Sequence, residues 1–103
     1  MADRNEYPAS VVINGRQLNR VTIDQYYREN HPEMDDLLIL KLVNEISGSV
    51  FDIEMERGGF EYFRVEPVVL DERPYRLVLV MYVHDDYLGV VNAFRVPKGK
   101  KYD

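Results

Sequence analysis

The sequence predicts an α+β fold, in which helices pack on an antiparallel sheet, and three observations carry this prediction. The dipeptide Asn14-Gly15 follows a short apolar run and is a strong signal for a two-residue β-hairpin turn, because both positions tolerate positive φ. Residues 32–47 carry apolar side chains at helical spacing. Residues 50–96 turn to runs rich in valine, leucine and aromatic residues, which are typical of strands. The predicted order is a β-hairpin, one short and one longer helix, and an antiparallel meander sheet of three to four strands.

The predicted hairpin pairs residues 11–13 with residues 16–23 around the Asn14-Gly15 turn. Residues 1–9 are polar and contain a proline, so we expect a loose N-terminal arm there. Residues 97–103 are expected to form a basic C-terminal tail. The whole chain of 103 residues is predicted to be a single domain with one modest core.

Two helices are predicted between the hairpin and the meander. The short one is expected over residues 24–29 and ends near His31, because the residue before Pro32 is disfavoured in the α region. Pro32 suits the first position of the longer helix, which runs to a stop at Gly48. The acidic residues that suit the positive end of its dipole are Glu33, Asp35 and Asp36.

The longer helix is more apolar than a helix with one buried face requires. Its broad apolar face holds Leu38, Ile39, Leu42, Val43 and Ile46. Met34, Leu37 and Leu40 fall off that face. Either the hairpin or the short helix covers these three side chains, or they contact another subunit.

The strands of the meander are predicted from alternation and turn residues. Residues 51–56 alternate between apolar and acidic side chains, which indicates an exposed edge strand. Residues 60–70 form the next strand, with Pro67 at a bulge or an unpaired position. Residues 75–83 are apolar at nearly every position, so this strand is expected to be central and covered on both faces. Residues 88–96 form its hairpin partner.

Composition limits the class of protein. The chain has no cysteine, which excludes disulfides and thiol chemistry and is consistent with a cytoplasmic location. Neither a signal peptide nor an apolar run long enough to span a membrane is present in the sequence, and no metal or other cofactor is expected. The net charge of −5 disfavours RNA as a partner, because nucleic-acid-binding proteins usually have a basic surface.

The best candidate site lies on two neighbouring strands of the meander. Alternation places Tyr62, Arg64 and Glu66 on one face of the first strand. It also places Arg76 and His84 on one face of the second strand, and pairing makes the two faces coincide. Metal-free RNA cleavage needs a carboxylate that takes the 2′-hydroxyl proton, a histidine that protonates the leaving oxygen, and arginines that hold the phosphate. The alternative is an ordinary solvated sheet surface.

Several stretches resemble the small toxin-like domains of the barnase–EndoU–colicin–RelE superfamily, in particular its BrnT-like and phage-borne branches. The stretches, within residues 22–98, are Arg28-Glu29-Asn30-His31-Pro32-Glu33, GGFEYFRVEP, RPYRLVLVMYV and GVVNAFRVPK. The resemblance implies a helix followed by a four-stranded meander, metal-independent ribonuclease activity and an antitoxin partner. It also implies that His31 matches the histidine at the helix entry, that Tyr62 and Arg64 lie on an aromatic–basic strand, and that Arg95 and Lys98 form the basic C-terminal end.

The sequence therefore predicts a metal-independent endoribonuclease domain of a toxin–antitoxin type system, with Glu66 or Glu33 as the base and His84 or His31 as the acid. The predicted catalytic residues are His84, Glu66, His31 and Tyr62. The predicted phosphate-binding residues are Arg64, Arg76, Arg95 and Lys98. The alternative is a non-catalytic interaction domain that binds a protein partner or associates with itself through Leu37 and Leu40.

Overall fold

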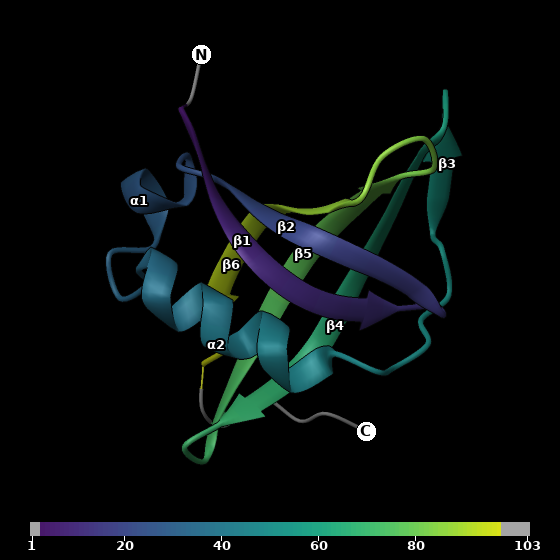
Figure 1. The fold of residues 1–103 in the computed structure, drawn as a ribbon. Helices are drawn as coiled ribbons and strands as arrows, with labels where there is room; N and C mark the ends of the chain where they lie inside the picture. The colour runs from purple at the N-terminus through teal and green to yellow at the C-terminus, as the bar shows by residue number, and fades with distance from the viewer. Residues whose placement is uncertain (1–2, 98–103) are drawn as a thin grey trace.

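The computed structural model describes residues 3–97, which form six strands and two helices around one core (Figure 1). The strands are β1 (Arg4–Ile13), β2 (Arg16–Asp24), β3 (Met55–Arg57), β4 (Phe60–Leu70), β5 (Arg73–Tyr82) and β6 (Tyr87–Arg95). The helices are α1 (Tyr27–Asn30) and α2 (Asp36–Ile46). All six strands belong to one sheet with the order β1-β2-β6-β5-β4-β3.

The predicted fold class is wrong, because the hairpin and the meander form one six-stranded mixed sheet and the helices are short. The connection is a parallel pairing of β2 with β6, which sets Arg20 beside Tyr87 and Ile23 beside Val90. Two strands this far apart in sequence leave no local pattern that predicts their pairing, whereas the residues of a hairpin turn do predict the pairing of the strands that they join. The prediction of a loose N-terminal arm is also wrong from residue 4 onward, because Arg4 begins strand β1.

Both helices are shorter than predicted. Asp24 ends β2, Gln25 and Tyr26 form a turn, and α1 is a single helical turn. The longer helix begins at Asp36 rather than at Pro32, because the Asp35 side chain caps it by accepting a hydrogen bond of 2.8 Å from the Leu38 amide.

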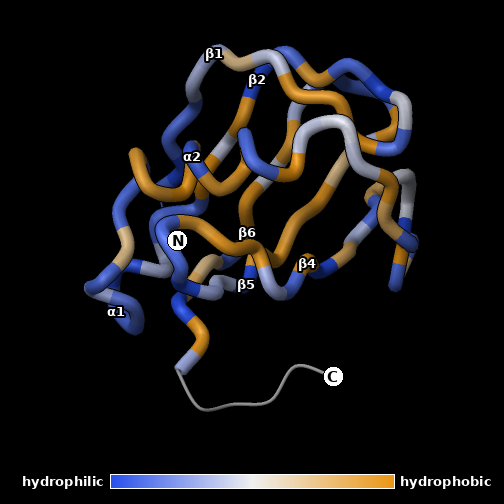
Figure 2. The backbone as a smooth tube through the Cα atoms, turned by 90° about the horizontal axis from the view of Figure 1, so that it is seen from below, coloured by the Kyte–Doolittle hydropathy of each residue, from blue (hydrophilic) through white to orange (hydrophobic). Residues whose placement is uncertain are grey.

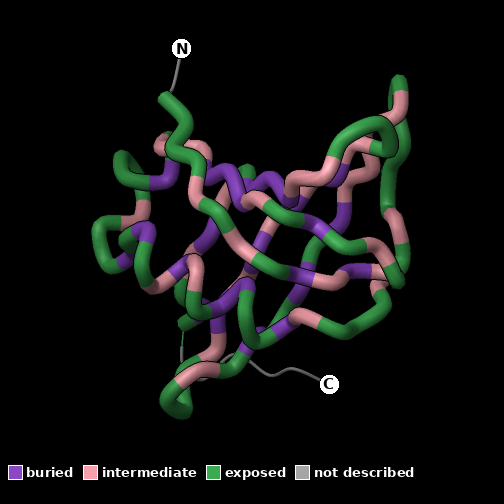
Figure 3. The backbone as a smooth tube through the Cα atoms, in the orientation of Figure 1, coloured by how far each residue is buried: buried purple, intermediate pink, exposed green. Residues whose placement is uncertain are grey.

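The core lies between α2 and one face of the sheet. Figure 2 shows the hydrophobic stretches of the strands in the middle of the sheet, and Figure 3 shows buried and less buried positions alternating along them. The buried residues of α2 face a core that includes Leu77, Leu79 and Met81 of β5, whereas Val83, just after this strand, is 45% exposed. The strand β5 is central, as predicted, but it is buried on one face only, because alternate residues from Arg76 to Tyr82 stay half-buried.

At the edges, β3 confirms the predicted edge strand but contains only residues 55–57. The register of β4 against β5 shifts between Val65 and Val68, which confirms the bulge predicted at Pro67.

Gly89 of β6 is required where the sheet is most closely packed. A Cβ atom there would lie 2.7 Å from Cγ1 of Val80 and 3.3 Å from Oγ1 of Thr22. We expect Gly89→Ala to lower the free energy of unfolding by about 1–3 kcal/mol, measured by chemical denaturation. Adding Val80→Ala should recover part of this loss, so the two changes should couple in a double-mutant cycle. A Gly89→Ala protein as stable as the wild type would contradict the close approach.

Candidate functional site

The sheet face that α2 does not cover, here called the open face, carries the residues predicted from the sequence. Register places Tyr62 opposite Val80, Val80 opposite Gly89, and Gly89 opposite Thr22, so these positions form a row across four strands. Residues two positions away along each strand share the face. The other members of the open face are Phe60, Arg64, Glu66, Arg76, Val78, Tyr82, Tyr87, Asn92, Phe94, Arg20 and Asp24.

At one end of the open face, four side chains from separate segments come together, and we call them the His31 cluster: His31, Phe94, Arg76 and Glu66. The His31 ring, just after α1, stacks on the Phe94 ring of β6 with centroids 4.7 Å apart. Cζ of Arg76 on β5 lies 5.3 Å from the centroid of the same ring. Arg76 Nε donates to Oε1 of Glu66 on β4, and the two side chains are only 34% and 21% exposed. An imidazole and a cation therefore lie against one aromatic ring, and a carboxylate pairs with the cation.

Glu33 lies beside this cluster. Its Oε2 atom is 3.9 Å from Nδ1 of His31 and accepts a hydrogen bond of 3.3 Å from the backbone amide of Arg95. This contact ties the segment between α1 and α2 to the end of β6. The segment that carries His31 is therefore attached to β6 in two ways: the His31 ring stacks on Phe94, and Glu33 accepts a hydrogen bond from the Arg95 amide.

The other predicted residues lie elsewhere. His84 follows β5 at the far end of the strand from Arg76, where its ring meets the Tyr82 ring edge-on with centroids 5.3 Å apart. Arg64 is on the open face but is held by Glu54, whose Oε1 accepts from its Nε at 2.8 Å. Arg95 is exposed and is adjacent in the strand to Phe94, so it belongs to the opposite face. Lys98 lies outside the described residues.

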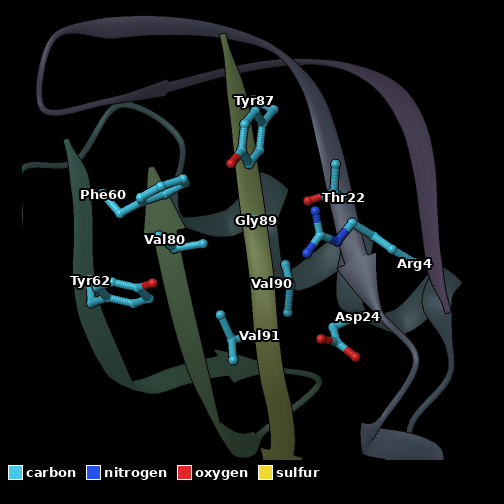
Figure 4. A pocket seen from close by; sticks show the side chains of 10 residues that line it. All are labelled: Arg4, Thr22, Asp24, Phe60, Tyr62, Val80, Tyr87, Gly89, Val90 and Val91. Atoms are coloured by element: carbon cyan, nitrogen blue, oxygen red, sulfur yellow. The ribbon is translucent and has the colours of Figure 1, made fainter. Parts of the chain in front are cut away.

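Tyr62 lines a pocket in the middle of the open face rather than the His31 cluster (Figure 4). The pocket has a volume of about 330 Å³. Its lining residues are Arg4, Thr22, Asp24, Phe60, Tyr62, Val80, Tyr87, Gly89, Val90 and Val91. No local pattern in the sequence indicates this pocket, because the pocket depends on the pairing of β2 with β6.

A second feature that sequence reasoning missed is the buried carboxylate of Asp36, which the pattern assigned only to the helix dipole. Side chains from β1, from the turn after β2 and from α1 all donate hydrogen bonds to it. The donors are Asn5 Nδ2 (2.8 Å), Tyr7 Oη (2.5 Å), Gln25 Nε2 (3.1 Å), Tyr27 Oη (2.6 Å) and Arg28 Nη2 (3.4 Å). Burial by itself raises the pKa of the Asp36 carboxyl, but the donated hydrogen bonds outweigh burial and lower the pKa to about 2. Burial and the bond to Asp36 raise the pKa of the Tyr27 hydroxyl.

The side chains expected to mediate self-association differ in exposure. Leu37 is 63% exposed, whereas Leu40 is half-buried in a shallow hollow that Pro8 and Val11 of β1 also line. Intrachain cover, one of the two alternatives drawn from the sequence, therefore holds for Leu40 and for the buried Met34.

Between residues 3 and 97 there is no group of three or more His, Cys, Asp or Glu side chains placed to hold a metal ion. Neither helix of this range is long and apolar enough to cross a membrane. No protein-family model, curated protein or solved structure matches the chain.

Proposed function

We propose that the protein is a metal-independent endoribonuclease domain of the toxin type, and that the His31 cluster is its reaction centre. The observation that carries the proposal is that His31 and Arg76, from separate segments of the chain, both lie against the Phe94 ring, and that Arg76 is paired with Glu66 of a third segment. These are the three kinds of group that metal-free RNA cleavage needs.

Each residue has a defined role in this proposal. The Glu66 carboxylate takes the proton of the 2′-hydroxyl, and the 2′-oxygen attacks the adjacent phosphorus. The bond from phosphorus to the 5′-oxygen breaks, and the His31 imidazolium gives its proton to that oxygen. The products are a 2′,3′-cyclic phosphate and a 5′-hydroxyl. Arg76 turns from Glu66 to the phosphate as the substrate binds, which neutralises the charge that develops on its oxygens and frees the carboxylate.

The test is incubation of the purified protein with total RNA in EDTA, followed by mapping of the new ends. Cleavage is expected to continue in EDTA and to leave 2′,3′-cyclic phosphate and 5′-hydroxyl ends, because water and metal take no part in the step. RNA that stays intact at high protein concentration, or ends that carry a 5′-phosphate, would contradict the proposal. The same assay with a small acidic partner protein tests for an antitoxin, which would mask the open face.

A second candidate function is a non-catalytic interaction domain, and the ion pairs that Arg64 and Arg76 already make within the chain favour it. Arg64 is paired with Glu54 and Arg76 with Glu66, so the two predicted phosphate-binding arginines on the open face are already neutralised. The net charge of −5 acts in the same direction. Intact RNA in the assay above would favour this function, with the exposed Leu37 as a contact for a second copy or another protein.

A further inference from the structure

The pocket on the open face combines an aromatic wall with a polar wall. Phe60 and Tyr62 stand on one side, and Arg4 and Asp24 stand on the other, with Gly89 on the floor between them (Figure 4). The volume of about 330 Å³ is at the lower end of the range for small-molecule sites, which suits one flat ring system. Aromatic side chains at the edge of such a hollow provide faces on which a planar ligand stacks.

The polar wall presents two hydrogen-bond donors next to two acceptors. Arg4 and Asp24 are direct partners in the β1–β2 register, so their side chains leave the sheet side by side. Within residues 3–97 neither one has an ion-pair partner within 4.0 Å. Oδ1 of Asp24 accepts a hydrogen bond of 3.0 Å from the Tyr26 amide, which fixes the carboxylate, and no residue of the described part of the chain donates to its other oxygen. Figure 4 shows the Arg4 guanidinium extended past Thr22 toward the floor of the pocket.

We infer that this pocket binds a guanine base. Along one side of the guanine ring, N7 and O6 are two adjacent acceptors, and the N1–H and N2–H₂ groups that follow are two adjacent donors. An arginine fork beside a carboxylate matches this order of four groups, with the guanidinium on N7 and O6 and the carboxylate on N1–H and N2–H₂. Adenine and uracil have neither adjacent pair, and cytosine lacks the adjacent donors, so each of these bases leaves at least one charged side chain without a full set of partners.

The inference deepens the proposed function and, for its RNA form, rests on it. Tyr62 precedes Glu66 by four residues on β4, which is roughly 13 Å along a strand. A guanine in the pocket would therefore lie about two nucleotides from the bond that the His31 cluster cleaves. Cleavage sites in RNA should then carry a guanine at one fixed distance from the cut.

The test uses the four nucleoside 5′-monophosphates as probes, because they share the phosphate and differ only in the base. Titrations followed by amide chemical shifts are expected to show GMP binding at least tenfold more tightly than AMP, CMP or UMP. Arg4→Gln and Asp24→Asn should each reduce the affinity for GMP to the level of AMP. The asparagine retains the acceptor for the Tyr26 amide, so the turn after β2 is preserved. Arg57→Gln and Asp52→Asn, which change exposed residues outside the pocket, are the matched controls and should bind GMP as the wild type does.

The outcomes separate the two proposals. Equal affinity for all four nucleotides, or a GMP preference that survives both pocket variants, overturns the guanine site. Cleaved RNA with no fixed guanine near the cut overturns the guanine site in RNA and leaves the ribonuclease proposal intact. A GMP preference that depends on Arg4 and Asp24, together with intact RNA, supports the guanine site and contradicts the ribonuclease.

Discussion

Replacing Asp36 with alanine is expected to lower the free energy of unfolding by about 3–5 kcal/mol, the range for removing one member of a buried charged network. Only 8% of the Asp36 surface is exposed, and five side chains donate hydrogen bonds to its carboxylate. The Tyr27 hydroxyl, in a residue that is 1% exposed, would be left without its acceptor. The network also joins β1 to both helices, so its loss weakens several elements at once.

Urea denaturation followed by circular dichroism measures this loss, and the neighbouring residue gives the control. Asp35→Asn changes the same residue type one position earlier, but asparagine caps a helix as well as aspartate does, so a change within about 0.5 kcal/mol is expected. A loss below about 1 kcal/mol for Asp36→Ala would mean that the carboxylate is not the centre of the network.

Acid should remove the same stabilisation. The pKa of Asp36 is lowered from an ordinary value of 3.8 to about 2 in the folded chain, so the folded state favours the ionised carboxylate. Its contribution of about 2 kcal/mol is present above pH 4 and is lost as the pH falls toward 2. The wild type should therefore lose more stability between pH 4 and pH 2 than Asp36→Asn, which has no carboxyl at this position to protonate.

The fold was predictable from the sequence wherever the signal was local. The Asn14-Gly15 turn has positive φ at both residues, and alternation assigns Tyr62, Arg64 and Arg76 to the correct face of β4 and β5. The joining of β2 to β6 was not predictable, because a parallel pair between distant segments has no turn to mark it. The start of α2 was misplaced, because Pro32 and Asp35 both suit a helix N-terminus and only the observed cap at Asp35 decides between them.

The part of the candidate site that lies on neighbouring strands was also predictable, because it follows from local alternation. Period-two alternation placed Glu66 and Arg76 on the same face of one hairpin, and in the structure they form an ion pair. Alternation also added His84 to their face, but a strand rises about 3.3 Å per residue, so the eight residues from Arg76 to His84 place the two far apart. The position of His31 was beyond local reasoning, because its contact with Phe94 depends on how the α1 segment folds back over β6.

The largest effect on activity is expected from His31→Ala and Glu66→Gln, each of which should reduce the rate of RNA cleavage by roughly 10²–10⁴-fold, as losing one general acid or base does. The glutamine has the shape of Glu66 and can still accept from Arg76, so a loss there reports the carboxylate's proton transfer rather than its packing. Added imidazole should restore part of the activity of His31→Ala, because it fills the space beside Phe94 and carries the missing proton.

His84→Ala is the decisive comparison, because it removes the same type of side chain from the other end of the open face. Its ring contacts Tyr82 and takes no part in the His31 cluster, so the rate should stay within about twofold of the wild type. The reverse result, with activity lost on changing His84 and kept on changing His31, would move the reaction centre to the Tyr82 end of the face. There the nearest carboxylates, Asp85 and Asp86, are held by Arg20, so a general base would be lacking at that end and the proposed division of roles would fail.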